Sequence, residues 1–419
     1  MNEPIFIARQ DTLEQEILPA HWLSHYKLFG EESYTYQNKE IWKKLCMSSA
    51  AANDRDMHGE ALEEMLTTFS AEHTGKWMLL IYGMDAATLE GLATMAEIAA
   101  NATAMDAVAG NEILMHAITN SETAMQAIST SKTAMEKITT NGAAMDAIGR
   151  SRIAKSAVQA SPYYNSCIKE NDMAIAKFAV ALANFESAGY SGCAGMAADS
   201  TAMTAIAASS AAMTAIAVSV VAMNAIGGNS IARDEISASP YYDANIREND
   251  MAIAKLVVGF ANLESARYSG CAGMAADSTA MTAVAASSTA MTAVAASSTA
   301  MTAVAASATA MGKIAEVASA LSKLSANTTA LDALYARKKQ MKGASATKTG
   351  KFIILEISAS NAFNTSKYGY ATLSDGSKPD WSSYLTKYAF FKQYPKYATY
   401  MKNDTDSDDY IYYFDIASP

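Results

Sequence analysis

The chain has 419 residues, and half of them are apolar. Charged residues make up 18%, against the quarter that is typical of globular domains, and the net charge is −10. This balance argues against binding to a nucleic-acid backbone, which needs clustered Lys and Arg. The length allows two or three ordinary domains. The first residues are acidic, without a basic segment followed by an apolar one, so we expect no secretory signal.

Residues 1–90 differ in composition from the rest of the chain. They hold three of the four tryptophans, and residues 60–72 have the apolar spacing of an amphipathic helix. We predict a small helical head that docks the chain to something else. His21 and His25 have the i, i+4 spacing that can bind a metal on a helix, but neither the glutamate of an HExxH motif nor a third ligand accompanies them. Helix packing beside Trp22 is the simpler interpretation.

From residue 91 to about 340, a phrase of ten residues repeats with the consensus S-x-x-A-M-x-A-I/V-x-x. One slot is held by Met95, Met105, Met115, Met125, Met135, Met145, Met203, Met213, Met223, Met281, Met291, Met301 and Met311, and then by Leu321 and Leu331. A fixed period of this kind indicates a fold that is built from repeated structural units.

The period of ten excludes one continuous helix. At about 100° per residue, ten residues fall about 80° short of three turns, so Met would move around the helix axis from phrase to phrase. We therefore predict one helix of about 6–7 residues per phrase, capped by Ser or Thr at a corner. Met and Ile/Val lie three residues apart, on one face of such a helix. Successive helices are expected to zigzag and to stack these side chains into one narrow core.

Two other structures fit these phrases less well. A β-solenoid with ten-residue coils is disfavoured because Ala and Met are poor strand formers and turn glycines are missing. A membrane span over residues 278–312 has sufficient length and no charge, but nearly every third residue is Ser or Thr. The predicted fold is therefore mainly α: a solenoid of short helices whose neighbours supply the core.

The sequence also has a longer period of 78 residues, since residues 161–238 are nearly copied in residues 239–316. The ten-residue pattern places Asn165 in the Met slot. One shortened phrase then shifts the register by two residues, so that the next Met slot falls on Met173. Cys193 and Cys271 also fall in the Met slot. The four cysteines, with Cys46 and Cys167, show no metal-ligand spacing, so we interpret them as small buried thiols made in a reducing compartment.

Composition changes again after the repeats. Residues 334–351 are basic and rich in Gly, Ser and Thr, which predicts a linker in which Lys338, Lys339 and Lys342 face solvent. Residues 350–419 alternate and carry many tyrosines, so we predict a compact β-rich domain. Its aromatic side chains pack the domain or, alternatively, stack on sugar rings.

Few residues in the chain suggest chemistry. Asp404, Asp406 and Asp408 alternate like the start of a calcium loop, but the glycine and glutamate of that loop are missing, which favours a polar hairpin loop. Cys193 and Cys271 lie in "YSGCAGM" without a histidine nearby. No GxSxG, P-loop or dinucleotide motif occurs. We expect no catalytic, cofactor-binding or metal-binding residue and no enzymatic activity.

Capped "AM-x-A-I/V" phrases between a distinct head and a small β-rich tip resemble the tail-fibre and tail-tip proteins of bacteriophages. The resemblance rests on residues 90–340, and on 350–419 only in general character. It implies a structural virion protein in several copies, made in the host cytoplasm and placed in the tail. The head would contact other virion proteins and residues 350–419 a host-surface glycan or protein, without nucleic acid or a membrane span. The alternative is a cellular scaffold that binds proteins through the flank of the solenoid.

Overall fold

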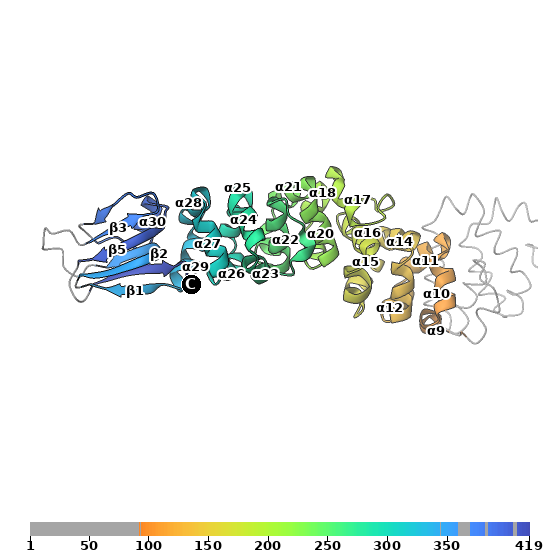
Figure 1. Ribbon diagram of the computed structural model, residues 1–419. Coiled ribbons are helices and arrows are strands. Elements are labelled where there is room, and N and C mark those ends of the chain that lie inside the picture. Colours follow the sequence, from red (N-terminus) through yellow and green to blue (C-terminus); the bar gives the residue numbers. More distant parts are fainter. Residues whose placement is uncertain (1–91, 93, 344, 359–368, 382–383, 405–408) are drawn as a thin grey trace, which may run out of the picture. The chain divides into compact units, whose positions relative to one another are not determined.

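The computed structural model describes residues 92, 94–343, 345–358, 369–381, 384–404 and 409–419, which are drawn as ribbon in Figure 1. The predicted head, with His21, His25 and Trp22, lies outside these residues. The chain divides into two compact units, Met1–Met196 and Ala197–Pro419. The described part of the first unit is an array of short helices. The second unit continues with the same kind of helices and ends in an antiparallel sheet (Figure 1).

Nearly every phrase of ten residues forms one helix of 6–9 residues. The first unit contains α9 (Met95–Ala100), α10 (Ala102–Ala109), α11 (Glu112–Thr119), α12 (Glu122–Ser129), α13 (Lys132–Thr139), α14 (Gly142–Arg150) and α15 (Arg152–Ala160). It continues with the π-helix η1 (Asn165–Lys169) and the longer α16 (Asp172–Leu182), and α17 (Cys193–Ala198) follows. The sequence therefore predicted the short capped helix correctly.

The second unit repeats this arrangement. Its helices are α18 (Ser200–Ala207), α19 (Ser210–Ala217), α20 (Val220–Gly228), α21 (Ser230–Ala238), η2 (Asp243–Arg247), α22 (Asp250–Phe260) and η3 (Ser265–Arg267). They are followed by α23 (Cys271–Ala276), α24 (Ser278–Ala286), α25 (Ser288–Ala296), α26 (Ser298–Ala305), α27 (Ala308–Ala315), α28 (Ala318–Ala326) and α29 (Thr328–Ala336).

Within each unit the helices form a three-sided coil and not the expected zigzag. In most of the coil a helix packs on the helix three places further along, as α10 does on α13 and α24 on α27, while α14 packs on α16 and α20 on α22. The chain bends by 103° between α18 and α19 and by 103° between α24 and α25. Three such bends nearly close a turn, so every third helix lies above its predecessor. Met and Ile or Val point into the coil, and Met291 and Val294 are fully buried.

At several corners of the coil a serine has two roles. The side chain of Ser151 accepts a hydrogen bond from the amide of Ala154 at 3.2 Å, which caps α15, and its hydroxyl donates to the carbonyl of Thr119 at 2.5 Å. Thr119 ends a helix of the preceding turn, whose last carbonyls have no partner within their own helix. Ser131, Ser161, Ser239 and Ser307 donate in the same way to a carbonyl 32 residues earlier. One small polar residue therefore caps its own helix and ties it to the turn before.

The structure corrects several assignments to the Met slot. In a typical helix, the Met amide bonds to the carbonyl of the capping residue, as Met203 does to Asp199. Ile175 takes this position after Asn171, so the phrase keeps its register and Met173 lies half-buried beside the slot. Likewise Met196 and Met274, and not Cys193 and Cys271, follow the helix starts at Gly192 and Gly270. Asn165 is exposed and therefore not in the buried slot. The periodicity alone did not show where each cap lies, and the cap sets the register.

The C-terminal sheet has six strands in the order β1-β6-β2-β5-β3-β4. Their bounds are β1 (Lys339–Lys342), β2 (Ala346–Ser358), β3 (Gly369–Leu373), β4 (Asp380–Trp381), β5 (Ala398–Asn403) and β6 (Tyr410–Asp415), with the short helix α30 (Ala389–Gln393) between β4 and β5. The segment predicted as a linker forms β1 and the start of β2. Its composition is that of a loop, but pairing with the distant β6 and β5 satisfies its backbone groups.

The strand order also corrects the expected hairpin around Asp404. The start of β2 pairs with β5 and its second half with β6, with a register shift between Thr349 and Phe352. Because β2 lies between β5 and β6, these two consecutive strands are not a hairpin. One side of the sheet encloses a core that includes Phe352, Trp381 and Phe390.

Candidate functional site

The sheet is fixed to the end of the helical coil by a shared core. Ile353, Leu355 and Phe414 are fully buried and belong to the same hydrophobic cluster as Leu331 and Leu334 of α29. These side chains alternate along β2 and β6 with those of the sheet's own core, as expected when both faces of a strand are covered. The last helix therefore forms part of the sheet's support.

A cluster of tyrosines, lysines and carboxylates surrounds this junction. The Tyr335 ring lies between the ammonium groups of Lys338 and Lys387, 4.1 and 4.3 Å from its centroid, and its hydroxyl donates to Glu356 at 2.5 Å. Burial, and then this hydrogen bond, raises the pKa of Tyr335 to about 12. Tyr388 packs edge-on against Tyr335 and donates to Asp332 of α29. The tyrosines, ammonium groups and carboxylates of this cluster thus contact one another, and the cluster anchors the sheet to α29.

The backbone at Tyr388 is strained. Its φ is +70°, a left-handed conformation that a side chain other than glycine adopts at a cost of about 1–3 kcal/mol. The Tyr388 ring belongs to the cluster shared with α29, and Lys387 forms an ion pair with Asp332 at 3.1 Å. The contacts with the coil compensate for the strain, which indicates that the sheet needs the coil for its own conformation.

An exposed tyrosine face lies on the sheet away from its core. Ala371 and Met401 point into the core, so Tyr370 and Tyr400, their neighbours along β3 and β5, point to the opposite face. The two rings are half-buried, with centroids 5.6 Å apart. Partial desolvation, and then a hydrogen bond to Tyr370, raises the pKa of Tyr400. Thr347 and Thr349 of β2, paired with Lys402 and Tyr400, extend this face with hydroxyl groups.

Tyr370, Tyr400, Thr347, Thr349 and Lys402 define this tyrosine face. Lys402 forms an ion pair with Asp404 at 2.9 Å at its edge. Asp406 and Asp408, which the sequence placed with Asp404 in a calcium-like pattern, lie outside the described residues. Across the described ranges no group of three or more His, Cys, Asp or Glu side chains is placed to hold a metal.

The coil contains a polar site that the sequence analysis missed. Lys177 of α16 is 4% exposed, and its ammonium bonds to both carboxylate oxygens of Asp146 at 2.8 and 2.9 Å and to the carbonyl of Ser187 at 3.0 Å. The Ser187 hydroxyl donates to the same carboxylate at 2.5 Å. The ion pair ties two stacked helices to the loop after α16.

The second copy of the 78-residue repeat keeps the lysine and changes its partner. Lys255 is 1% exposed and donates to the amide oxygen of Asn224 at 2.5 Å and to the carbonyl of Ser265 at 3.1 Å. Burial lowers the pKa of Lys255. Asn224 stands 78 residues after Asp146, and this exchange within the repeat was the signal that could have identified the site.

The cysteines of the repeats are buried and form no disulfide, and their surroundings favour the unreactive thiol form. Burial, and then the neighbouring Asp172, raises the pKa of the Cys193 thiol far above its usual value. Burial, and then the hydrogen bond to Asp250, does the same for Cys271. A thiol held protonated is a poor nucleophile and a poor metal ligand. Cys167 is also buried and free.

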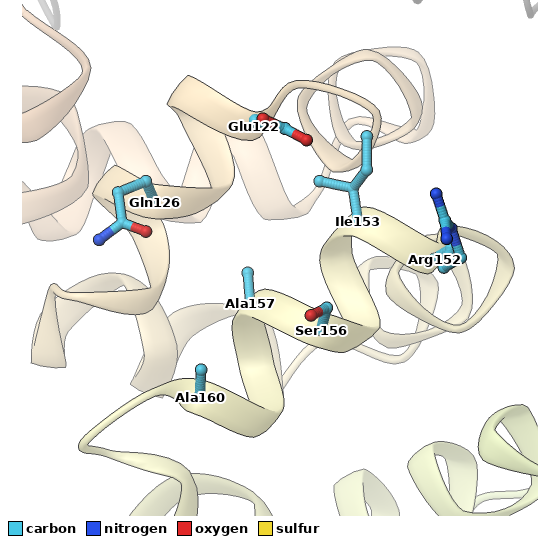
Figure 2. A pocket seen from close by; sticks show the side chains of 7 residues that line it. All are labelled: Glu122, Gln126, Arg152, Ile153, Ser156, Ala157 and Ala160. Atoms are coloured by element: carbon cyan, nitrogen blue, oxygen red, sulfur yellow. The ribbon is translucent and has the colours of Figure 1, made fainter.

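Grooves run along the outside of the coil between stacked helices. Figure 2 shows one between α12 and α15, of about 460 Å³, in which Glu122 and Gln126 lie along one helix and Arg152 and Ile153 along the other. Its lining carries one carboxylate and one guanidinium, with alanines at one end. A groove with balanced charge and small side chains suits contact with a polypeptide more than capture of a charged small molecule.

No model of a known protein family matches the chain, and no curated protein matches it in sequence. Within the described ranges no single helix is long and apolar enough to cross a membrane. Two consecutive pairs, α18 with α19 and α24 with α25, reach the necessary length and hydropathy together but are bent at the break between them.

Proposed function

We propose that the chain is a structural virion component, a tail-fibre or tail-tip protein, whose helical coil carries the C-terminal sheet as a host-surface-binding or adaptor tip. The observation that carries the proposal is the junction between α29 and the sheet. A shared core and the cluster around Tyr335 and Tyr388 make the sheet a fixed end of the coil. A tip that transmits force or position needs such an attachment, whereas an independent enzyme domain does not.

The repeats make the coil stiff but give it little length per residue. Three phrases of ten residues form one turn of the coil, and a turn advances by the spacing of two packed helices, roughly 8–10 Å. The same residues in one straight helix would span about 45 Å. Each turn is bonded to the next through the capping serines. The phrases therefore form a broad and rigid support.

The tyrosine face is the surface we assign to the partner of the tip. Aromatic rings beside hydroxyl groups suit the faces and edges of sugar rings, and tyrosines contribute large contact areas with little loss of side-chain entropy. Tyr370, Tyr400, Thr347 and Thr349 provide these groups on one side of the sheet. We propose a glycan of the host surface as the partner of this face.

The test uses the full chain, because residues 345–419 alone would lack β1 and would expose Ile353 and Leu355. The full chain is screened against an array of bacterial lipopolysaccharides and capsular polysaccharides, together with the double variant Tyr370→Ala, Tyr400→Ala. We expect binding to a subset of the array that the double variant loses while its circular dichroism is unchanged. Absence of binding to the array, or equal binding by both proteins, would contradict the proposed role of the tip.

The alternative is a cellular scaffold that binds proteins along the coil, and the groove between α12 and α15 favours it. The variant Ala157→Trp fills that groove and leaves the sheet unchanged. Loss of co-purifying proteins in Ala157→Trp would support the scaffold, provided that the variant and the wild type behave alike on the polysaccharide array, whether both bind or neither binds. Tail and baseplate genes next to the coding sequence would support the virion protein.

A further inference from the structure

A second groove, in the unit Ala197–Pro419, differs in chemistry from the one in Figure 2. It has a volume of about 460 Å³ and follows the outer face of α25, between the end of α22, η2 and α28. From α25 it is lined by the hydroxyl groups of Ser288, Thr289 and Thr292, all exposed, and by two alanines. One wall of the groove therefore presents a row of hydrogen-bonding groups at helical spacing.

Two aromatic rings form another part of the groove. Tyr242 and Phe260 are half-buried, and both pack against the core of the coil. The guanidinium of Arg233 lies 5.9 Å from the centroid of Phe260 and is held by a hydrogen bond to the carbonyl of Gly227 at 2.7 Å. The Phe260 ring is thus fixed in place. Fixed rings beside hydroxyl groups suit the apolar face of a pyranose.

The charged residues that line the groove are both cations, Arg247 and Lys323. Arg247 forms an ion pair with Asp243 at 2.9 Å, but its buried Nε has no hydrogen-bond partner among the described residues, and the nearest Glu248 oxygen is 3.6 Å away. That carboxylate accepts hydrogen bonds from the first amides of α26. Lys323 makes no hydrogen bond or ion pair within the described ranges. A negative group in the groove would find an unsatisfied donor and an unpaired ammonium.

Seventy-eight residues earlier, the chain keeps Tyr164, Ser210 and Thr214 at the positions that match Tyr242, Ser288 and Thr292, but it differs at other positions of the groove. Leu182 replaces Phe260 and Ala211 replaces Thr289. Asn245 stands where Lys323 follows the second copy, and its amide oxygen accepts a hydrogen bond from the Thr214 hydroxyl at 2.8 Å. In the first copy, therefore, the polar groups satisfy each other. The groove along α25 thus has a ring, a hydroxyl and a cation that the matching positions 78 residues earlier do not have.

We propose that the groove along α25 binds an acidic sugar unit, a pyranose ring that carries a carboxylate. The ring of the sugar stacks on Tyr242 and Phe260, its hydroxyl groups bond to those of Ser288, Thr289 and Thr292, and its carboxylate pairs with Lys323. The volume is within the range of sites for small ligands. This site lies on the helical coil, so it is separate from the tyrosine face and does not depend on the proposed function of the tip.

The experiment is saturation-transfer NMR on the full chain with digalacturonate as the probe and its dimethyl ester as the uncharged control. We expect transfer from the protein to the ring protons of digalacturonate, weakened by added salt and much lower for the ester. Lys323→Asn and Phe260→Leu introduce the residues that stand 78 positions earlier, Asn245 and Leu182, so both should fold. Lys323→Asn should weaken the affinity roughly three- to tenfold, and Phe260→Leu several-fold.

Lys313→Asn on α27 removes the same charge from a half-buried lysine that pairs with Glu316, outside the groove, and should leave the affinity unchanged. The proposal is overturned if wild type shows no transfer to digalacturonate, if the ester binds equally well, or if Lys313→Asn and Lys323→Asn have the same effect. Binding that survives in Lys323→Asn and Phe260→Leu but is lost in Tyr370→Ala, Tyr400→Ala would also overturn it, because the sugar would then sit on the tip.

Discussion

The two copies of the 78-residue repeat share one arrangement of helices but give a buried lysine two different partners. In both copies a lysine crosses from one stacked helix to the next and donates to the carbonyl of a loop serine. In the first copy its charge is balanced by Asp146, and in the second it meets the neutral Asn224. The positions of the helices are therefore set by the caps and by the packing of small side chains. The buried polar group adds a local contribution that can change without changing the fold.

The copies also differ in how closely two helices approach. In the second copy a Cβ added at Gly259 of α22 would lie 2.2 Å from the carbonyl oxygen of Gly227 in α20. The first copy has Ala181 at the position of Gly259, and the Cβ of Ala181 is 2.8 Å from a Cβ placed on Gly149. The absence of a side chain at Gly259 thus permits a backbone contact in the second copy that the first copy does not make.

The largest effect is expected from deletions. Removing residues 161–238 takes out one whole copy, η1 to α21, and rejoins equivalent surfaces, since Ser239 can then donate to Ser129 in place of Ala207. This variant should fold cooperatively and be roughly 20 Å shorter, given seven segments at three per turn. Circular dichroism during heating and X-ray scattering measure the two properties.

Removal of residues 161–165 is the matched control, and it should prevent folding because it places slot residues at corners. If both deletions unfold the chain equally, the two copies are not interchangeable. The long deletion also brings Lys255 opposite Asp146, so it should lose the pH dependence described below for Lys255.

The next largest effect is expected at the ion pair of the first copy. Asp146→Ala leaves Lys177 buried without its carboxylate and should reduce the free energy of unfolding by about 3–5 kcal/mol. Asp106→Ala removes an ion pair with Lys137 across the same sequence separation, but that pair is exposed and should contribute less than about 1 kcal/mol. Urea denaturation compares the two. Equal losses would show that burial of Lys177 does not matter.

A smaller effect is expected where the second copy is tightest. Gly259→Ala places a methyl group against the backbone of Gly227 and should destabilise the chain by about 1–3 kcal/mol. Gly273→Ala is the control, because nothing lies within 4 Å of its added Cβ and the residue is in a helix; it should be stabilising by up to about 1 kcal/mol. A neutral result for Gly259→Ala in thermal denaturation would mean that α20 and α22 can separate freely.

The smallest effect concerns the pH dependence that Lys255 confers. The pKa of Lys255 is lowered in the folded chain, so between that value and 10.5 the unfolded chain binds a proton that the folded chain has lost. The free energy of unfolding should therefore rise with pH in this window. Asn224→Asp provides a carboxylate, which should remove most of the rise and add about 1 kcal/mol at neutral pH. Urea denaturation across pH checks both, and a destabilised Asn224→Asp would contradict this account of Lys255.

The period of ten and the placement of Ser, Met and Ile determined the helices from the sequence alone. A continuous helix cannot keep a ten-residue pattern on one face, so the chain must break once per phrase, and a small polar residue at the break must cap the next helix. The alternation in residues 350–419 predicted a β-rich domain in the same way. These are local properties, because each depends on residues within a few positions of each other.

Tertiary structure decided what depends on residues far apart. The three-sided coil requires the Ser151 hydroxyl to meet a carbonyl 32 residues earlier, and no local pattern shows that partner. Residues 339–349 have the composition of a linker, yet they are strands because β6 and β5 bond to them. The groove along α25 needs Tyr242, Thr292 and Lys323 from three different turns of chain. Stacking distance and strand pairing, which set these contacts, follow from the packing of the whole coil.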